Sequence, residues 1–210
     1  MSSYPLTKNA LDRGVTAGLL VLLAPAFALA SAAVGLNGLL DARDRGPLLY
    51  RERRISRGRE FELLKFRTLR PAALERQRGG EAHARLLEED PENLTWMGRR
   101  ILKPWYLDEL PQLVNILRGD ISLVGPRPWP PSMVANQVAQ GLHYRNYAIA
   151  GWTGPAQIQK GVIEPAGYAA LDLDYVEACR SWSGARLLRH DLSILWRTVK
   201  VLARGEGLRF

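Results

Sequence analysis

Two adjacent carboxylates, Asp108 and Glu109, stand in an otherwise apolar stretch directly before a proline, in the run LDELPQL over residues 107–113. If this run is helical, neighbouring side chains point about 100° apart, so the two acids are expected to have different roles. Asp108 has the chemistry of a nucleophile or a metal ligand, and Glu109 that of a metal ligand or a base. Acids in the first turn of a helix also interact favourably with its dipole, and that structural alternative stays open.

Cations lie on both sides of this acidic pair. Downstream, Arg118 begins the run RGDISLVGPRP, in which two prolines restrict the backbone around Arg127 and suit it to a fixed anion contact. Upstream, Lys65 and Arg67 occupy alternate positions, which share one face if the segment is a strand. Carboxylates that bind Mg²⁺, together with Lys and Arg that bind phosphate oxygens, indicate a site for phosphoryl transfer.

Several other chemistries are excluded by missing motifs. The chain has 210 residues, three histidines and one cysteine, Cys179, which cannot form an internal disulfide. It contains no phosphate-binding loop of the G-x-x-x-x-G-K-[ST] type, no G-x-G-x-x-G fingerprint and no Cys/His set with zinc spacing. These absences argue against P-loop kinases, Rossmann dehydrogenases and zinc hydrolases.

Residues 14–40 carry no charged side chain, and this length exceeds the roughly 20 residues that cross a bilayer as a helix. Pro25 lies near the middle of the stretch, where it predicts a kink or break. Basic residues flank both ends, with Lys8 and Arg13 before and seven arginines after. Because Lys and Arg are retained on the cytoplasmic side, this pattern favours a re-entrant helix over a straight span. A straight span and a buried core helix are the alternatives.

The net charge of +8 is unevenly distributed. Residues 1–60 carry +4, residues 61–179 carry −1 and residues 180–210 carry +5. We therefore expect the two ends to face the anionic leaflet of a membrane. The balanced middle predicts no large basic face, which argues against a nucleic-acid-binding protein.

The expected fold class is α+β and mainly helical. We expect two parts, a re-entrant membrane helix with its lead-in (1–41) and a cytoplasmic membrane-surface catalytic domain (42–210), forming one structural unit. The domain should contain strands at 47–50 and 61–66 around a turn with Gly58, a surface excursion or short exposed helix without a catalytic role at 71–92, several short helices at 94–117 and mostly loop with short helical pieces at 129–167.

The last predicted helix, residues 186–202, is amphipathic. Its apolar residues recur at steps of four and three and form one stripe, which consists of Leu188, Leu192, Leu195, Val199 and Leu202. Basic residues lie largely off the stripe, and Trp196 suits a headgroup boundary. Packing of the stripe on protein alone remains the alternative to a membrane contact.

The order of three motifs resembles the bacterial sugar transferase family, the monotopic phosphoglycosyl transferases. The motifs are KFRTL (65–69), LDELPQL (107–113) and RGDISLVGPRP (118–128), and they follow an apolar segment with a central proline. The resemblance covers nearly the whole chain. It implies transfer of a sugar 1-phosphate from a UDP-sugar to polyprenyl phosphate, such as undecaprenyl phosphate, with release of UMP and a requirement for Mg²⁺. It also implies a place on the cytoplasmic face of the bacterial inner membrane, at the first membrane step of glycan or exopolysaccharide assembly.

The resemblance also assigns roles to residues. The position of Asp108 is that of a nucleophile that forms a covalent phosphosugar intermediate, and Glu109 matches its partner in metal binding or proton handling. The helix break corresponds to Ala24 and Pro25. Residues expected to bind substrate or phosphate are Lys65, Arg67, Lys103, Arg118, Arg127, Arg145 and Asp172.

Three departures from the family pattern stand beside these assignments. Ala24 replaces a serine before the proline, and Lys103 replaces an arginine, which keeps the charge but loses the bidentate fork. Ile149 stands where the family has an anion-binding arginine, and Arg145 could take over that role only if the path of the loop allows it. A catalytically weakened member or a membrane-anchored scaffold are therefore alternatives. The residues leave open which UDP-sugar is the donor and whether the chain forms a homodimer.

Overall fold

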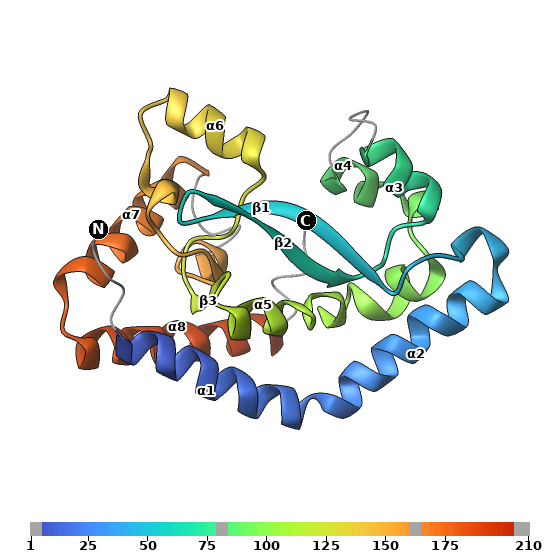
Figure 1. Ribbon diagram of the computed structural model, residues 1–210, viewed down its shortest axis with the longest axis horizontal. Helices are drawn as coiled ribbons and strands as arrows, with labels where there is room; N and C mark the ends of the chain where they lie inside the picture. Colours follow the sequence, from blue (N-terminus) through green and yellow to red (C-terminus); the bar gives the residue numbers. More distant parts are fainter. Residues whose placement is uncertain (1–5, 79–83, 160–164, 204–210) are drawn as a thin grey trace. The chain divides into compact units, whose positions relative to one another are not determined.

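The computed structural model describes residues 6–78, 84–159 and 165–203. These residues are mainly helical, with one small antiparallel hairpin, as expected for the fold class (Figure 1). The elements are α1 (Leu6–Leu22), α2 (Ala24–Leu40), η1 (Ala42–Asp44), β1 (Leu49–Ser56), β2 (Arg59–Phe66), α3 (Pro71–Arg78), α4 (Ala84–Glu89), η2 (Pro91–Asn93), η3 (Gly98–Leu102), η4 (Leu107–Glu109), α5 (Gln112–Arg118), β3 (Ser122–Val124), α6 (Pro131–Ala139), η5 (Tyr144–Asn146), β4 (Gly151–Thr153), η6 (Gln157–Gln159), α7 (Pro165–Ser181) and α8 (Gly184–Ala203).

The chain forms two compact units. The first unit takes Met1–Gly18, Arg53–Leu63 and Val114–Phe210, and the second takes Leu19–Glu52 and Leu64–Leu113. The helix α1 and the hairpin strands β1 and β2 each contribute residues to both units. The expected division at residue 41 separates a membrane segment from a catalytic domain, and it stays a prediction.

The apolar segment is broken near its middle. The helix α1 ends at Leu22 and α2 begins at Ala24, with Pro25 in its first turn. A proline there cannot donate to the preceding turn and its ring clashes with it, so the helix restarts in a new direction. Among the described residues no single helix is long and apolar enough to cross a bilayer, but Thr7–Leu22 and Ala24–Leu40 pass this test together and meet at a bend of 64°.

The helix α1 buries polar residues and exposes apolar ones. Lys8, Asp12 and Thr16 lie on one face and are all buried. In the first unit the Lys8 Nζ lies 2.6 Å from the Asp191 carboxylate, and Ser122 Oγ donates to Asp12 at 2.5 Å. The sequence predicts Lys8 as part of the basic flank before the apolar stretch, but its side chain forms an internal ion pair with Asp191.

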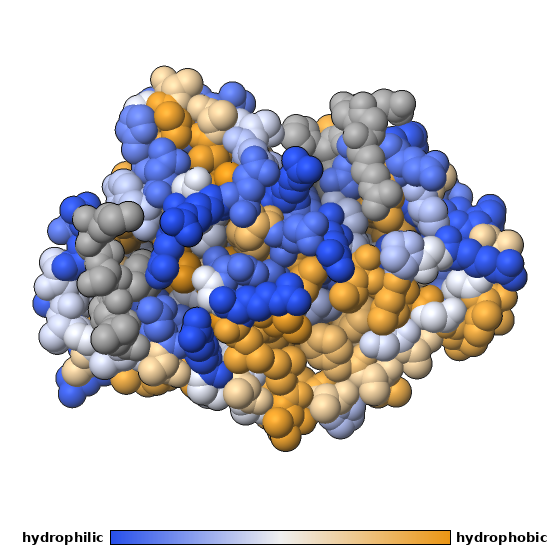
Figure 2. Space-filling model, viewed as in Figure 1, coloured by the Kyte–Doolittle hydropathy of each residue, from blue (hydrophilic) through white to orange (hydrophobic). Residues whose placement is uncertain are grey.

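The helix α2 is anchored by a narrow stripe and leaves the rest of its apolar surface uncovered. Ala30, Val34 and Asn37 are buried at helical spacing. By contrast, Leu29, Leu39 and Leu40 are each more than 70% exposed, and Leu36 is 46% exposed. Figure 2 shows hydrophobic surface over this helix. Such a continuous exposed apolar surface is unusual for a helix surrounded by water.

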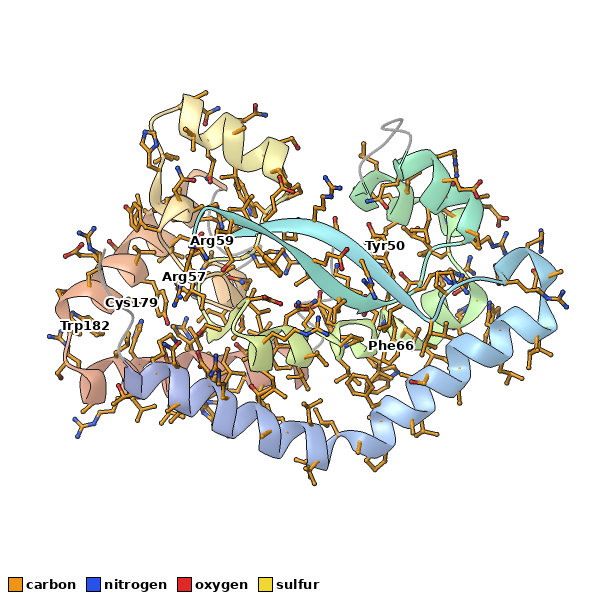
Figure 3. The ribbon with its side chains drawn as sticks, viewed as in Figure 1. Tyr50, Arg57, Arg59, Phe66, Cys179 and Trp182 are labelled. Atoms are coloured by element: carbon orange, nitrogen blue, oxygen red, sulfur yellow. The ribbon has the colours of Figure 1, made fainter. Side chains whose placement is uncertain are left out.

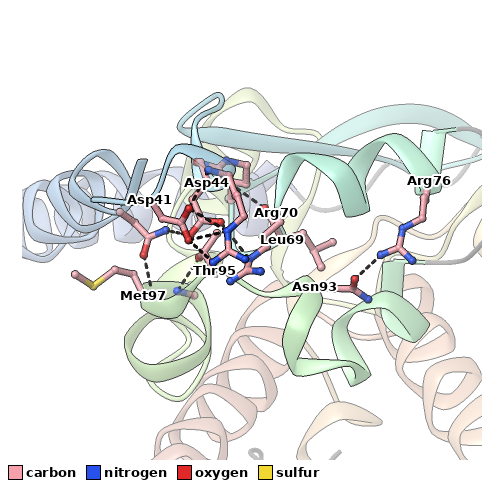
Figure 4. Close-up of polar contacts among 12 residues, drawn as sticks. Asp41, Asp44, Leu69, Arg70, Arg76, Asn93, Thr95 and Met97 are labelled. Atoms are coloured by element: carbon pink, nitrogen blue, oxygen red, sulfur yellow. Dashed lines mark hydrogen bonds and ion pairs between the residues drawn. The ribbon is translucent and has the colours of Figure 1, made fainter. Parts of the chain in front are cut away.

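The end of α2 is held by a polar cluster in the second unit, part of which is drawn in Figure 4. Asn37, a buried amide within the apolar run, donates to the carboxylate of Asp44 and accepts from the backbone N–H of Met97 at 3.3 Å. Asp44 also pairs with Arg70 at 3.2 Å. These contacts tie the end of α2 to the chain just before η3.

The hairpin is longer than the sequence predicted. Its first strand runs over Leu49–Ser56, and the expected segment 47–50 covers only the start of it. The remaining residues are mostly charged and lack an apolar pattern, but a two-stranded ribbon can keep a charged face in water. The turn is Arg57–Gly58, and both residues have positive φ, as a type I′ hairpin turn requires. Figure 3 labels Arg57 in this turn and Arg59, the first residue of β2.

The excursion at 71–92 has a hydrophobic core of its own. The helices α3 and α4 bury Ala73, Leu74 and Leu87 against Leu69 and Leu94 in the second unit. The expectation of a merely exposed segment was therefore wrong, because the leucines in this Glu/Arg-rich stretch were too few to form a visible pattern. The glycines at 79 and 80 lie outside the described residues.

A short parallel pair, which the sequence did not predict, organises the first unit. In β3 and β4, Ser122 pairs with Gly151 and Val124 with Thr153. The next residue, Gly125, donates to the Thr153 carbonyl at 2.9 Å, and a Cβ at Gly125 would come within 2.6 Å of the Ile149 carbonyl. The glycine of the GPRP run is therefore required by this close approach of two backbones.

The last helix forms over Gly184–Ala203, close to its predicted bounds. Its buried face consists of Leu187, Asp191 and Ile194, which lies one position away from the predicted apolar stripe. The stripe itself is only partly covered, since Leu192 is 51% and Val199 is 56% exposed. Packing on protein alone therefore does not account for the stripe.

Candidate functional site

The acidic pair lies on a short 3-10 turn, η4, in the second unit. Tyr106 precedes it with a left-handed backbone conformation (φ 53°), which turns the chain sharply into Leu107. Leu107 and Leu110, on either side of the acids, pack into a core with Ala30 and Val34 of α2. Phe66, labelled in Figure 3, belongs to the same core. Its ring centroid lies 5.3 Å from that of Phe27. The broken apolar helix therefore positions the acidic turn directly.

Asp108 is a buried carboxyl group with an unusual pKa. Its side chain is among the buried polar groups of the chain, with 6% exposure. Burial, followed by the negative charge of Glu109, raises the pKa of Asp108 to about 7, while Lys65 and Lys103 oppose this rise. A carboxyl group that is costly to ionise beside two cations is typical of a functional site rather than of a helix dipole.

Each of the two cations near Asp108 has a glutamate partner. Lys65 on β2 lies 4.0 Å from Glu52 on β1, and Lys103, directly after the π turn η3, lies 2.7 Å from Glu88 on α4. The π turn depends on Gly98, where a Cβ would come within 2.7 Å of the Thr68 carbonyl. Such turns recur at functional sites because they redirect the next side chain.

Arg67 is close in sequence to Lys65 but is differently placed. It is 1% exposed, and its guanidinium donates to the carbonyls of Pro47 (2.8 Å), Leu69 (3.1 Å) and Asp44 (2.6 Å). In this structure Arg67 therefore holds the connection between α2 and β1 to the end of β2. Its expected contact with phosphate stays a prediction.

Arg145 and Asp172 form a buried cluster in the first unit. The guanidinium donates to Asp172 at 2.9 Å, to Gln137 at 2.8 Å and to the carbonyl of Arg127, and it lies 4.2 Å from the ring centroid of Trp129. The Tyr144 hydroxyl donates to the same Asp172 oxygen at 3.0 Å. Burial is the first cause of the raised pKa of Asp172 and of the lowered pKa of Arg145.

The two remaining expected phosphate-binding residues are exposed. Arg118 is the last residue of α5. Arg127 stands in the GPRP run, and its backbone carbonyl accepts a hydrogen bond from Arg145. The structure thus brings Lys65, Lys103, Asp108 and Glu109 together in the second unit. It groups Arg127, Arg145 and Asp172 in the first unit.

Sequence reasoning missed the acidic partners Glu52 and Glu88. Glu52 follows an arginine in what reads as a charged stretch, and Glu88 lies in the excursion to which we assigned no catalytic role. The alternation of side chains along the two strands of the hairpin could have placed Glu52 on the same face as Lys65. No local pattern connects Glu88 with Lys103, because their contact depends on how α4 folds back.

The donor set near Asp108 fits a Mg²⁺ ion that is completed by substrate. Among residues 6–78, 84–159 and 165–203 no group of three or more His, Cys, Asp and Glu could hold a metal by itself. Mg²⁺ is commonly bound by one or two carboxylates plus substrate phosphates, so two acids suffice. Burial and, after it, the negative charge of Glu109 raise the pKa of Asp108, and a bound divalent cation would oppose both effects.

The chain is similar to known proteins over most of its length. A family model described as bacterial sugar transferase matches residues 3–205. A UDP-glucose:undecaprenyl-phosphate glucose-1-phosphate transferase of Caulobacter vibrioides is 35% identical over 96% of this chain and 72% of its own length. An exopolysaccharide production protein, ExoY, of Sinorhizobium fredii is 32% identical over 96% of this chain and 88% of its own. An undecaprenyl-phosphate galactose phosphotransferase of Salmonella typhimurium is 33% identical over 79% of this chain and 35% of its own. The acidic turn, its two lysines and a match over nearly the whole length together show that this chain belongs to the bacterial sugar transferase family and is a sugar-phosphate transferase.

Proposed function

We propose that this enzyme transfers a sugar 1-phosphate from a UDP-sugar to undecaprenyl phosphate and releases UMP, with Asp108 as the nucleophile. The observation that carries this proposal is the buried Asp108, which lies next to Glu109, near Lys65 and Lys103, on a turn packed against an apolar helix. A nucleophile held in this way can meet a soluble nucleotide sugar and a lipid phosphate at one place. The names of the relatives give the same acceptor and the sugars glucose and galactose.

The reaction proceeds as a double displacement. A carboxylate oxygen of Asp108 attacks the phosphorus that bears the sugar, and the bond from this phosphorus to the UMP oxygen breaks. An oxygen of undecaprenyl phosphate then attacks the same phosphorus, which releases the Asp108 carboxylate and forms the lipid diphosphate sugar. Because the same carboxylate is consumed and regenerated, no further reactant is required.

The surrounding charges support both displacements. Lys65 and Lys103 are placed to stabilise negative charge on the transferred phosphate, and a pre-positioned cation in a site of low polarity is effective in this role. Glu109 and Asp108 would hold Mg²⁺, which neutralises charge on the phosphates when bound. The exposed Arg118 and Arg127 are further candidates for donor contacts.

Turnover in a defined membrane tests this function. Nanodiscs that contain the enzyme would receive Mg²⁺, undecaprenyl phosphate and, in turn, UDP-glucose, UDP-galactose or UDP-N-acetylgalactosamine, and UMP would be measured. One donor should release UMP, and without the lipid acceptor mass spectrometry should find the sugar phosphate on the peptide that contains Asp108. Absence of UMP with every donor would exclude the proposed reaction. UMP release that persists in Asp108→Asn would exclude only the nucleophile.

We also propose that α1 and α2 enter the cytoplasmic leaflet of the inner membrane as a re-entrant pair. The exposed apolar surface of α2, the bend of 64° and the inward polar face of α1 support this placement. The exposed stripe of α8, with Trp196 61% exposed, would lie at the headgroups, where its arginines favour anionic lipid. Single cysteines introduced at Thr7 and Ala42, after Cys179→Ser, should both react with a membrane-impermeant thiol reagent from the cytoplasmic side. Labelling from opposite sides would exclude the re-entrant placement.

A further inference from the structure

Lys103, one of the two lysines near Asp108, forms a short ion pair with Glu88. The Lys103 Nζ lies 2.7 Å from Glu88 Oε2, and both side chains are largely shielded from water, with 19% and 24% exposure. Lys65, the other cation near Asp108, lies 4.0 Å from its glutamate. The two lysines therefore differ in how tightly they are fixed.

The helix α4 holds Glu88 firmly, although it is short. Leu87, the preceding residue, is 5% exposed in the core of the excursion. Its carbonyl accepts from the Asn93 side chain at 2.9 Å, and the Asn93 oxygen accepts in turn from Arg76 (Figure 4). The backbone beside Glu88 is thus fixed by both a buried side chain and a hydrogen bond.

A lysine needs such a partner more than an arginine does. Its ammonium is a point charge on a flexible four-carbon stem, whereas a guanidinium has a rigid fork that presets its direction. Lys103 follows the π turn η3, which fixes the backbone but not the end of the side chain. A carboxylate at 2.7 Å restrains the ammonium at this end.

We propose that Glu88 is a positioning residue, which fixes the Lys103 ammonium near Asp108 so that it meets the phosphate of the donor. This inference rests on the proposed function, since it assigns Lys103 to the donor phosphate. It gives the excursion at 71–92 a role in the site. Glu88 acts on the donor through Lys103, and its negative charge is also a minor cause of the raised pKa of Asp108.

The test compares Glu88→Gln, which has the same shape without the charge, with Glu89→Gln on the same helix as the matched control. With the donor that the wild-type enzyme uses, Glu88→Gln should raise the KM for the UDP-sugar by about fivefold and leave kcat within about twofold, because an orienting contact is lost before the chemical step. Glu89→Gln should match the wild type. Glu88→Asp, which keeps the charge on a shorter stem, should recover part of the loss.

A second background shows whether Glu88 acts through Lys103. In Lys103→Gln, the further change Glu88→Gln should alter KM by less than about 1.5-fold, because the partner is already gone. An equal increase of KM in both backgrounds would overturn the inference, as would a Glu88→Gln enzyme that behaves like the wild type. Melting temperatures of all variants separate these results from misfolding, and Glu88→Asp supplies the comparison if Glu88→Gln is unstable. A wild-type enzyme without turnover would remove both the proposed function and this inference.

Discussion

Two buried acids, Asp108 in the second unit and Asp172 in the first, are held in different ways. Asp172 accepts from Arg145 at 2.9 Å and from Tyr144 at 3.0 Å, and Arg145 directs its other donors to Gln137 and a backbone carbonyl. The two cations near Asp108 instead pair with Glu88 and Glu52. The first cluster directs its charges mainly at its own members, although Asp172 Oδ1 has no hydrogen-bond partner among the described residues. The second keeps a carboxyl group with a pKa of about 7 near cations that are held by other acids.

This difference separates structural from chemical use of the same residue types. Arg145 is 5% exposed and directs its donors to groups inside the protein, which leaves it little capacity for a substrate, whereas the Lys103 side chain is 19% exposed. A buried carboxyl group with a like charge beside it is destabilising in the folded protein, and such arrangements persist at functional sites. Four experiments test how buried charges are used in the two units.

The largest effect is expected for Asp108→Asn. If this carboxylate is the nucleophile, UMP release should fall by at least about 1000-fold. The melting temperature should stay the same or rise, because the change removes a charge that burial disfavours. Steady-state turnover and thermal unfolding in the same detergent measure the two quantities. A variant that is less stable and still active would place Asp108 among the structural acids.

Arg145→Met should act mainly on stability. Removal of one member leaves Asp172 buried without its cation, and such losses typically cost about 3–5 kcal/mol of unfolding free energy. The double variant Arg145→Met, Asp172→Leu should recover most of this loss, since no unpaired charge remains. Chemical unfolding measures both. The predicted contact of Arg145 with substrate would gain support if Arg145→Lys kept its stability but lost affinity for the UDP-sugar.

Lys103→Met should weaken donor binding without unfolding the protein. Loss of one charged contact to phosphate is expected to raise the KM for the UDP-sugar by about tenfold. Lys200→Met, which removes a lysine from α8, is the matched control and should leave KM unchanged. Equal values for both variants would show that Lys103 does not contact the donor.

The smallest effect concerns the pH dependence of stability at Asp12. Burial is the first cause of its raised pKa, and this outweighs the opposing effects of Lys8 and Ser122. Because the folded chain then binds the proton more tightly than the unfolded chain, the free energy of unfolding falls as pH rises from about 4 through the raised pKa. Asp12→Asn should reduce this loss, on the order of 1 kcal/mol, when unfolding is measured at pH 4 and pH 7. An unchanged difference between the two pH values would show that Asp12 is not the group responsible.

Much of the fold followed from local patterns. Pro25 predicted the break between α1 and α2, the steps of four and three predicted α8, and several short helices were expected at 94–117, where η3, η4 and α5 lie. The strand at Leu49–Ser56 was underestimated and the parallel pair of β3 and β4 was missed. Charged ribbons carry no apolar alternation, and a three-residue parallel strand depends on a partner distant in the chain.

The candidate site, like the fold, followed partly from local sequence patterns and partly from contacts between distant residues. Residue types and their order along the chain identify the side chains that can react, namely Asp108, Glu109 and the Pro- and Gly-bounded arginines. Which of these side chains pair with each other depends on the folded chain. It directs Arg67 and Arg145 inward and brings Glu88 to Lys103, and burial then gives Asp108 its raised pKa. The physical reason is that pairing and desolvation arise from groups far apart in the chain, whereas reactivity and backbone restriction belong to the residues themselves.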